Sequence, residues 1–210
     1  MIIRRLGLCA YRPQFEAMRA FTAARTAATV DELWLLEHEP VYTLGLAGKA
    51  EHLLCNPQQI PLERIDRGGQ ITYHGPGQLV IYLLLDLARR GLKVRELVSI
   101  MEQALINTLE RYGIRGERLE GAPGVYVDGA KIAALGLRVS KGCSYHGLAL
   151  NVEVGLEPFE WINPCGYAGL RTTRMRDFGV TDRLDVIGEQ LLAQLQLLLP
   201  PTKPTAASAG

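Results

Sequence analysis

The sequence RGGQITYHGPGQ, residues 67–78, is the stretch from which the organisation of the whole chain follows. It holds four glycines, a proline, an arginine and a histidine. Because glycine has no Cβ, backbone rich in glycine can approach a neighbouring chain or a bound molecule very closely. Gly-Pro-Gly alone indicates a turn, but a turn requires neither Arg67 nor the pair Tyr73 and His74. We therefore interpret residues 67–78 as the wall of a binding site.

The segments around this wall predict a chain with both strands and helices. An apolar run at 79–87 reads as a buried strand, and short strands are expected at 33–40, 41–45 and 62–66, with a loop at 46–61. Apolar residues recur at helical spacing in three segments, 13–28, 94–112 and 182–199. Asp128-Gly129 between apolar runs predicts a tight hairpin, so Lys131 begins a strand, and another strand is expected at 144–154. Residues 155–179 are irregular, which in a compact domain usually indicates function.

Length and composition indicate an ordinary soluble protein. The chain has 210 residues, of which 48% are apolar and 21% charged, with a net charge of +1. We expect one domain over residues 1–199 and a disordered tail at 200–210. The charge balance predicts no binding of nucleic acid or of a membrane surface. No apolar run is long enough for a membrane span or a signal peptide, so a cytoplasmic protein is expected.

Four cysteines, Cys9, Cys55, Cys143 and Cys165, are widely spaced and form no Cys-x-x-Cys pair. Cys143 and His146 have the spacing of two metal ligands, but a second ligand pair is missing, and no metal is expected. Cys165 differs from the others because Asn163-Pro164-Cys165-Gly166 displays it in a constrained turn.

A nucleophilic thiolate requires a nearby base or cation that lowers the thiol pKa below its free value of about 8.5. Lys131, followed by the apolar residues 132–135, is one candidate, because a desolvated lysine acts as a base. His74 and His146, each beside a glycine, are the others. The spacing predicts either a Cys–His or a Cys–Lys pair and does not choose between them.

Residues 67–79 resemble the signature of the octanoyltransferases of lipoate synthesis, also called lipoyl(octanoyl) transferases or the lipoate-protein ligase B family. Residues 37–45, 131–136, 146–151 and 163–166 resemble further blocks of that family in the same order, so that the resemblance covers about residues 5–195. It implies an α/β (α+β) sandwich of mixed sheets with flanking helices, related to the biotin and lipoate protein ligases.

The resemblance implies an enzyme that moves an octanoyl (or lipoyl) group from acyl carrier protein to a lysine of a lipoyl domain. The acceptors would be the lipoyl domains of 2-oxoacid dehydrogenases and the H protein of glycine cleavage. Cys165 matches the nucleophile, which forms an acyl thioester, and Lys131 matches the residue that lowers the thiol pKa and serves as acid and base. The matching substrate-binding residues are Arg67, Gly68, Gly69, Gln70, Ile71, Thr72, Tyr73, His74, Ala134, Leu135, Gly136, Gly147, Leu148 and Ala149. Many relatives have serine where this chain has Ala133 and Ala134, which leaves a hydroxyl contact there unsupported.

The chemistry of a thioester agrees with these roles. A thioester is already activated, so neither ATP nor a metal cofactor is expected, and two steps at one site predict ping-pong kinetics. An eight-carbon chain requires an apolar pocket with close backbone contact. Each tetrahedral intermediate also requires donors to its oxyanion, and we expect backbone N–H groups near Gln78 or Cys165 to provide them.

Two alternatives remain. A lipoate or biotin ligase, which adenylates a free acid, has a similar glycine-rich segment, but it would need phosphate and Mg²⁺ sites and the chain has no Walker loop. It would not require Cys165 and Lys131 together. The other alternative is a non-catalytic module that docks carrier domains, in which Arg171, Arg174 and Arg176 contact an acidic partner.

Overall fold

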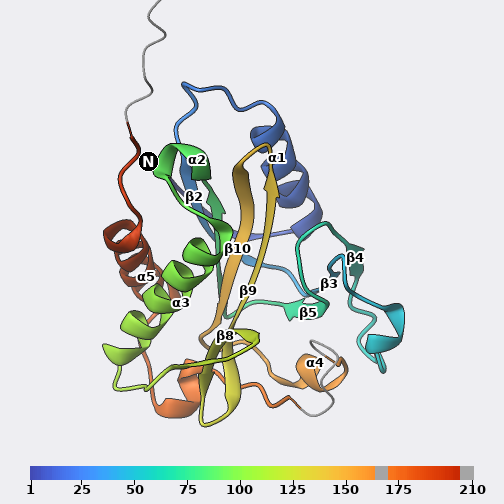
Figure 1. Cartoon of the computed structure of the whole chain (residues 1–210). Coiled ribbons are helices and arrows are strands. Elements are labelled where there is room, and N and C mark those ends of the chain that lie inside the picture. The colour runs from blue at the N-terminus through green and yellow to red at the C-terminus, as the bar shows by residue number, and fades with distance from the viewer. Residues whose placement is uncertain (164–169, 204–210) are drawn as a thin grey trace, which may run out of the picture.

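The computed structural model describes residues 1–163 and 170–203 (Figure 1). Its centre is a seven-stranded sheet of order β1-β2-β6-β10-β9-β8-β7. β1 pairs with β2 in parallel, and the other neighbours in this sheet are antiparallel. The strands are β1 Ile2–Cys9, β2 Glu32–His38, β6 Gln78–Leu84, β7 Glu117–Leu119, β8 Ala122–Val127, β9 Ala130–Ser140 and β10 Cys143–Asn151.

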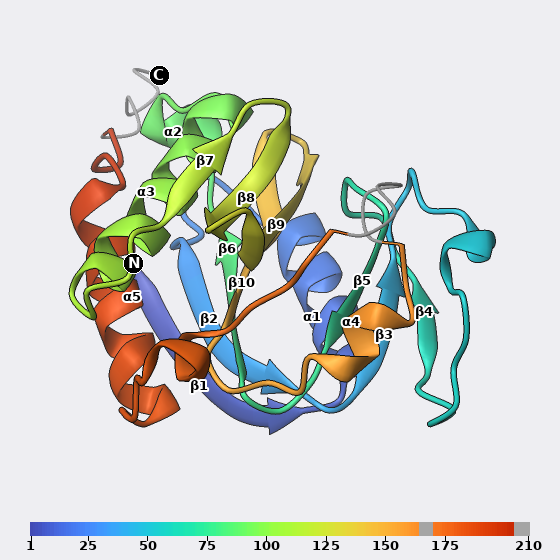
Figure 2. The same ribbon diagram turned by 90° about the horizontal axis from the view of Figure 1, so that it is seen from below.

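A second, three-stranded sheet lies beside the first (Figure 2). It consists of β3 Val41–Leu44, β4 Leu62–Arg64 and β5 Ile71–His74, with β3 parallel to β4 and antiparallel to β5. Strand β5 lies inside the glycine-rich stretch, where the sequence indicated the wall of a binding site and no strand. Two mixed sheets with helices confirm the predicted fold class.

Helices cover both faces of the large sheet (Figures 1 and 2). α3 and α5 pack side by side on one face, where apolar side chains such as Leu33, Leu83 and Met101 form the main core. α1 lies on the other face with Trp34 and Tyr82, so that β2 and β6 are buried on both sides. The helices are α1 Tyr11–Ala23, α2 Leu87–Arg90, α3 Val94–Glu110, α4 Glu157–Glu160 and α5 Leu184–Leu198, with short 3₁₀ turns at Ala50–His52 and Met175–Phe178.

The three long helices were predicted with shifted ends. α1 begins two residues before the expected start, because Pro13 is tolerated in a first helical turn, and it ends at Ala23 rather than near residue 28. The hairpin at Asp128-Gly129 is confirmed, with φ values of 49° and 74° that suit a two-residue turn. Strands β1 and β7 and helix α2 were not predicted.

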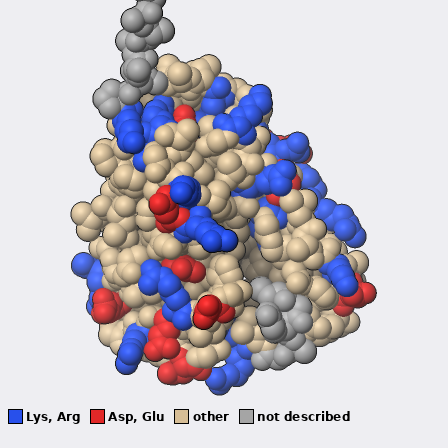
Figure 3. All heavy atoms as spheres, in the orientation of Figure 1, with Lys and Arg blue, Asp and Glu red and all other residues tan. Residues whose placement is uncertain are grey.

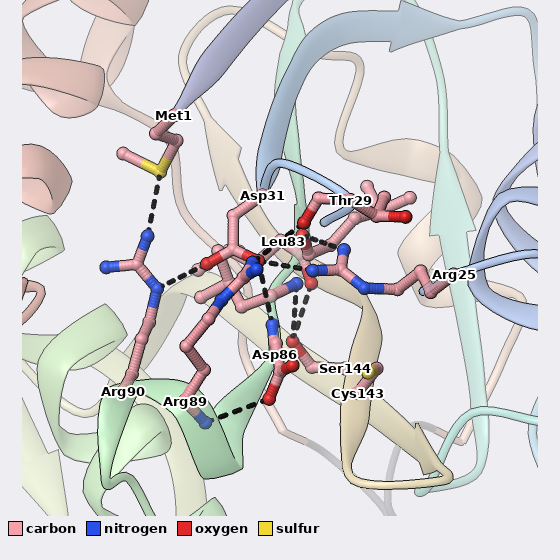
Figure 4. Close-up of polar contacts among 12 residues, drawn as sticks. Met1, Arg25, Thr29, Asp31, Leu83, Asp86, Arg89, Arg90, Cys143 and Ser144 are labelled. Atoms are coloured by element: carbon pink, nitrogen blue, oxygen red, sulfur yellow. Dashed lines mark hydrogen bonds and ion pairs between the residues drawn. The ribbon is translucent and has the colours of Figure 1, made fainter. Parts of the chain in front are cut away.

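A buried ion-pair cluster joins the end of α1 to β2 and α2 (Figure 4). The carboxylate of Asp31 contacts the guanidinium of Arg25, that of Arg89 at 2.8 Å and that of Arg90 at 2.6 Å. Burial alone would raise the pKa of Asp31, but the backbone N–H of Asp86 and the arginines outweigh it and lower the pKa below its usual value. The cluster therefore holds a charged carboxylate inside the protein.

The same cluster fixes the start of the C-terminal segment. Arg90 donates to the carbonyl of Pro200 at 2.6 Å, and the backbone N–H of Lys203 donates to Arg89 at 2.9 Å. Residues 200–203, which were expected to be disordered, are thus held against α2, while 204–210 lie outside the described residues. No helix in the described ranges combines the length and the apolar character that crossing a membrane requires.

Candidate active site

A cavity of about 340 Å³ lies against the large sheet on the side that faces the glycine-rich stretch. Ala134 and Gly136 of β9 border it next to their cross-strand partners Ala149 and Gly147 of β10. Since these four residues have at most a methyl group, the sheet is open here. β6 extends the border with Val80 and the larger Tyr82. The result is a largely apolar floor.

The predicted wall borders this floor as the sequence suggested. The predicted residues that line the cavity are Arg67, Gly68, Gly69, Gln70, Ile71, Thr72, His74, Ala134, Leu135, Gly136, Gly147, Leu148 and Ala149, together with Lys131. Tyr73 is the exception, because its ring packs against Tyr42 and Phe159 at centroid distances of 5.6 and 5.3 Å. Side chains alternate along a strand, so β5 turns Tyr73 away from the cavity that His74 borders.

Arg67 holds the wall in place. Its buried guanidinium donates to the carbonyls of Thr43 at 2.8 Å and Gln70 at 2.9 Å, and to the Thr43 hydroxyl at 2.9 Å. Two glycines make room for this arrangement. A Cβ at Gly45 would lie 2.5 Å from the carbonyl oxygen of Gly69, and a Cβ at Gly136 would lie 2.8 Å from Cδ of Arg67. Gly45 and Gly136 therefore permit a close approach of neighbouring atoms to the backbone.

His146 lines the cavity from a strained position. It has φ +60°, which is rare for a residue with a side chain. Consecutive strand residues normally face opposite sides, yet the hydroxyl of Tyr145 (2.6 Å) and Nε2 of His146 (3.1 Å) both reach the carboxylate of Asp66. The left-handed backbone makes this shared contact possible. Asp66 directly precedes Arg67, so the contact also ties β10 to the wall.

Three histidines near the wall, His38, His74 and His146, are buried. Burial lowers the pKa of His74 to about 3 and that of His38 to about 4. Burial also lowers the pKa of His146, although its contact with Asp66 opposes this. His74 is further occupied by Gln78, whose Oε1 lies 2.7 Å from its Nδ1. The choice between the Cys–Lys and Cys–His pairs stays a prediction, because Cys165 lies outside the described residues.

Lys131 lies at the start of β9 on the border of the cavity. Its Nζ donates to the carbonyl of Pro123 at 3.4 Å and lies 5.1 Å from the ring centroid of Tyr126. Its backbone pairs with the segment that follows residue 169, since Lys131 N–H donates to Arg171 at 2.8 Å and Thr173 N–H donates to Lys131 at 3.0 Å. Cys165 itself lies outside the described residues.

The expected oxyanion donors near Gln78 or Cys165 stay a prediction. The backbone N–H of Gln78 itself donates to the carbonyl of Gly75 at 3.1 Å. The other expected donor, near Cys165, lies outside the described residues. The Cys143 and His146 pair also has other partners, since Cys143 Sγ contacts the Lys141 carbonyl at 3.7 Å. In the parts of the chain that the structure describes, no group of three or more His, Cys, Asp or Glu residues is placed to hold a metal ion.

The three arginines proposed to dock a carrier make contacts within the protein. Arg171 donates to the carbonyl of Asp128 at 2.8 Å, Arg174 pairs with Asp177 at 2.9 Å, and Arg176 pairs with Glu153. Figure 3 shows acidic and basic side chains interspersed over one face of the molecule. These observations do not favour the docking module.

Sequence reasoning missed several residues of this site. Tyr11 and Tyr82 border the cavity, and Asp66 fixes its wall. Tyr11 of α1 precedes the helix expected at 13–28, and Tyr82 of β6 lies in an apolar run that indicates only core. The order of the strands brings both tyrosines to the cavity, and no local sequence motif predicts this position.

Comparisons with known proteins agree with this geometry. The sequence profile of the family described as the lipoyl protein ligase A/B catalytic domain matches residues 10–196. The octanoyltransferase of Azoarcus sp. (strain BH72) is 67% identical over 201 residues, 96% of this chain and 88% of the relative. The octanoyltransferase of Aromatoleum aromaticum is 68% identical over 204 residues, 97% of this chain and 88% of the relative.

Solved structures share the fold at low identity. A lipoate-protein ligase A bound with ATP has a TM-score of 0.77 at 18% identity, covering 94% of this chain and 84% of that one. The biotin protein ligase of Aquifex aeolicus has a TM-score of 0.56 at 12% identity, covering 95% of this chain and 69% of that one. These likenesses confirm the expected relation in fold. The family profile and the sequence relatives show that the chain belongs to the octanoyltransferases, acyltransferases of the lipoyl protein ligase A/B catalytic-domain family.

Proposed function

We propose that this octanoyltransferase takes the acyl group from octanoyl-acyl carrier protein and passes it to a lysine of a lipoyl domain through a thioester on Cys165. The acceptors are the lipoyl domains of 2-oxoacid dehydrogenases and the glycine cleavage H protein. One observation carries the proposal: Lys131 and the small residues of β9 and β10 border a single apolar cavity. The segment that follows Cys165 by a few residues pairs with the backbone of Lys131.

In the first half-reaction, Lys131 Nζ takes the proton of the Cys165 thiol. The thiolate attacks the thioester carbonyl carbon, and the tetrahedral intermediate expels the sulfur of the carrier, which receives that proton. One carbon–sulfur bond forms and one breaks, so that no oxidant, nucleotide or metal is needed. The cavity floor accepts the alkyl chain, whose burial contributes roughly 0.8 kcal/mol per CH₂.

In the second half-reaction, the neutral amine of the acceptor lysine attacks the octanoyl-Cys165 carbonyl. Lys131 removes a proton from the attacking nitrogen and returns it to the departing Cys165 sulfur. An amide forms, a thioester breaks, and the enzyme is regenerated. The acceptor enters after the first carrier leaves, which predicts ping-pong kinetics.

Intact mass measurement after incubation with octanoyl-acyl carrier protein tests the proposal. The unmodified chain should gain one octanoyl group, and Cys165→Ala should gain none. Cys55→Ala is the matched control, because Cys55 is exposed and has no proposed role. An adduct that persists in Cys165→Ala and maps to another residue would contradict the assignment.

A second measurement tests Lys131. The rate of Cys165 alkylation should rise through a thiol pKa that Lys131→Ala shifts upward, because the ammonium neighbour is lost. An unchanged pH profile would remove Lys131 from this role. The ligase alternative is tested separately, since it predicts octanoate-dependent exchange of pyrophosphate into ATP, which the transferase does not.

A further inference from the structure

A buried network of hydrogen-bonded side chains begins at the cavity wall and ends beside Lys131. At the wall, the Arg67 guanidinium donates to the hydroxyl of Thr43 at 2.9 Å. The Thr43 hydroxyl lies 3.4 Å from Nε2 of His74. All three side chains are buried. The network thus runs from Arg67, between β4 and β5, through Thr43 of β3 to His74 of β5.

From His74 of β5 the network crosses to side chains of the large sheet. His74 Nδ1 lies 2.7 Å from Gln78 Oε1, and Gln78 Nε2 donates to Asn151 Oδ1 at 2.9 Å. Asn151 Nδ2 then donates to the backbone carbonyl of Thr173 at 3.0 Å. Gln78 and Asn151 are direct cross-strand partners of β6 and β10. Their side chains are 2% and 4% exposed, so water does not substitute for these contacts.

The groups at the two ends of this network, the Arg67 guanidinium and the Thr173 carbonyl, fix the direction of every hydrogen bond in it. A guanidinium only donates and a backbone carbonyl only accepts. Asn151 must therefore present its NH₂ group to Thr173 and its oxygen to Gln78. Gln78 must then present its oxygen to His74, so Nδ1 of His74 carries the proton and Nε2 accepts from Thr43. Burial lowers the pKa of His74, which agrees with a neutral ring.

The network ends at the backbone of Lys131, the proposed base. The carbonyl of Thr173 accepts from Asn151, and its N–H donates to the carbonyl of Lys131 at 3.0 Å. Thr172 lies opposite Lys131 in a parallel bridge. Asn151 therefore sets the position of the segment 171–173, and this segment sets the position of the Lys131 backbone.

We propose that Gln78 and Asn151 are positioning residues for acyl transfer, which connect the wall at Arg67 to the segment beside Lys131. This rests on the proposed role of Lys131. Neither side chain contacts the acyl chain in this arrangement, since neither borders the cavity. Both act on the reaction through the placement of Lys131.

Asn151→Ala and Asn151→Asp test the proposal. Both remove the donor to Thr173, and the second keeps the size of the side chain. Misplacement of a reacting group by less than 1 Å is expected to lower kcat about 10-fold or more. KM for the octanoyl carrier should change by less than about twofold, because the cavity is unaltered. Backbone N–H exchange at Lys131 and Thr173 should accelerate in the same variants.

Asn107→Asp is the matched control. Asn107 also accepts from a glutamine, Gln103 at 2.6 Å, and donates to another, Gln194 at 3.0 Å, but this amide chain joins α3 to α5 away from the cavity. The control should keep its kcat. If it loses kcat equally, the effect is one of general stability and the proposal is wrong.

Nitrogen NMR of the protein without substrate provides a readout that does not depend on the reaction. The unmodified chain should show the Nδ1–H tautomer of His74, and Gln78→Glu should raise the His74 pKa, because a carboxylate replaces the amide. Asn151→Ala variants that fold and keep both kcat and the exchange rate at Thr173 would overturn the proposal, as would an Nε2–H tautomer. A failure of the proposed function is seen separately, as a missing octanoyl adduct on the unmodified protein.

Discussion

Gly136 and Gly147 face each other across β9 and β10, and alanine at these two positions should have different consequences. A Cβ at Gly147 would lie 2.1 Å from the carbonyl oxygen of Ile81. This oxygen belongs to the backbone of β6 and has no room to move. A Cβ at Gly136 would meet the side chain of Arg67, at 2.8 Å from its Cδ. Gly147→Ala would therefore clash with the backbone of the sheet, and Gly136→Ala would clash with a side chain of the cavity wall.

The distances set the magnitudes. Carbon and carbonyl oxygen approach to about 3.3 Å, so Gly147→Ala must separate β10 from β6 by about 1 Å. The loss of about two ladder hydrogen bonds and overpacking should together lower the free energy of unfolding by ~3–5 kcal/mol. Gly136→Ala requires a shift of about half an ångström in a side chain and should cost ~1–2 kcal/mol. Alanine also lowers the conformational entropy of the unfolded chain relative to glycine, which by itself stabilises the folded state. This effect is similar for both variants and cancels in the comparison.

Urea denaturation and octanoyl transfer measured on the same samples separate the two effects. The loss expected for Gly147→Ala is a substantial share of the stability of a typical domain, which is about 5–15 kcal/mol in total. Gly136→Ala should stay folded but transfer octanoyl more slowly, because displacement of Arg67 moves residues 67–70. Equal losses of stability in the two variants, or a Gly147→Ala protein as stable as the unmodified chain, would refute this reasoning.

Two further predictions concern the placement of Lys131 and the buried histidines. A Cβ at Gly124 would lie 2.8 Å from the Ala133 carbonyl oxygen and 3.2 Å from Lys131 Cε, so Gly124→Ala should reduce transfer about 10-fold or more. Gly121→Ala is its control, since Gly121 also has positive φ but no atom within 4 Å of its Cβ position. Equal losses of transfer in both variants would show that backbone strain at positive φ, rather than contact with Lys131, is the cause. Burial holds the pKa of His38 at about 4 against 6.5 in an unfolded chain. The unfolded state therefore binds more protons below pH 6.5, and the unfolding free energy should fall by up to ~1.4 kcal/mol per pH unit down to about pH 4. His38→Gln should flatten this fall in urea titrations at several pH values, and an unchanged slope would assign the fall to other groups.

Local patterns predicted the parts of the fold whose own residues decide their structure. The spacing of Leu97, Met101 and Leu105 predicted α3, because one face of that helix is entirely buried. Asp128-Gly129 predicted the hairpin, because its backbone requires left-handed conformations. β1 was not predicted, since Arg4 and Arg5 interrupt its apolar residues and it lies at the edge of the sheet. β5 was hidden among glycines, and its pairing with β3 involves residues about thirty positions apart.

The sequence by itself determined the identity of the cavity wall, because ordered motifs at 67–79, 131–136 and 146–151 depend on residue types and spacing alone. Only the tertiary structure decided which face of β5 meets the cavity and which histidines are buried, because alternation and burial depend on how strands are paired. The connection from Arg67 through Asn151 to Lys131 was likewise absent from any local pattern. It exists because pairing of β6 with β10 brings Gln78 to Asn151, and hydrogen bonds depend on distance in space rather than along the chain.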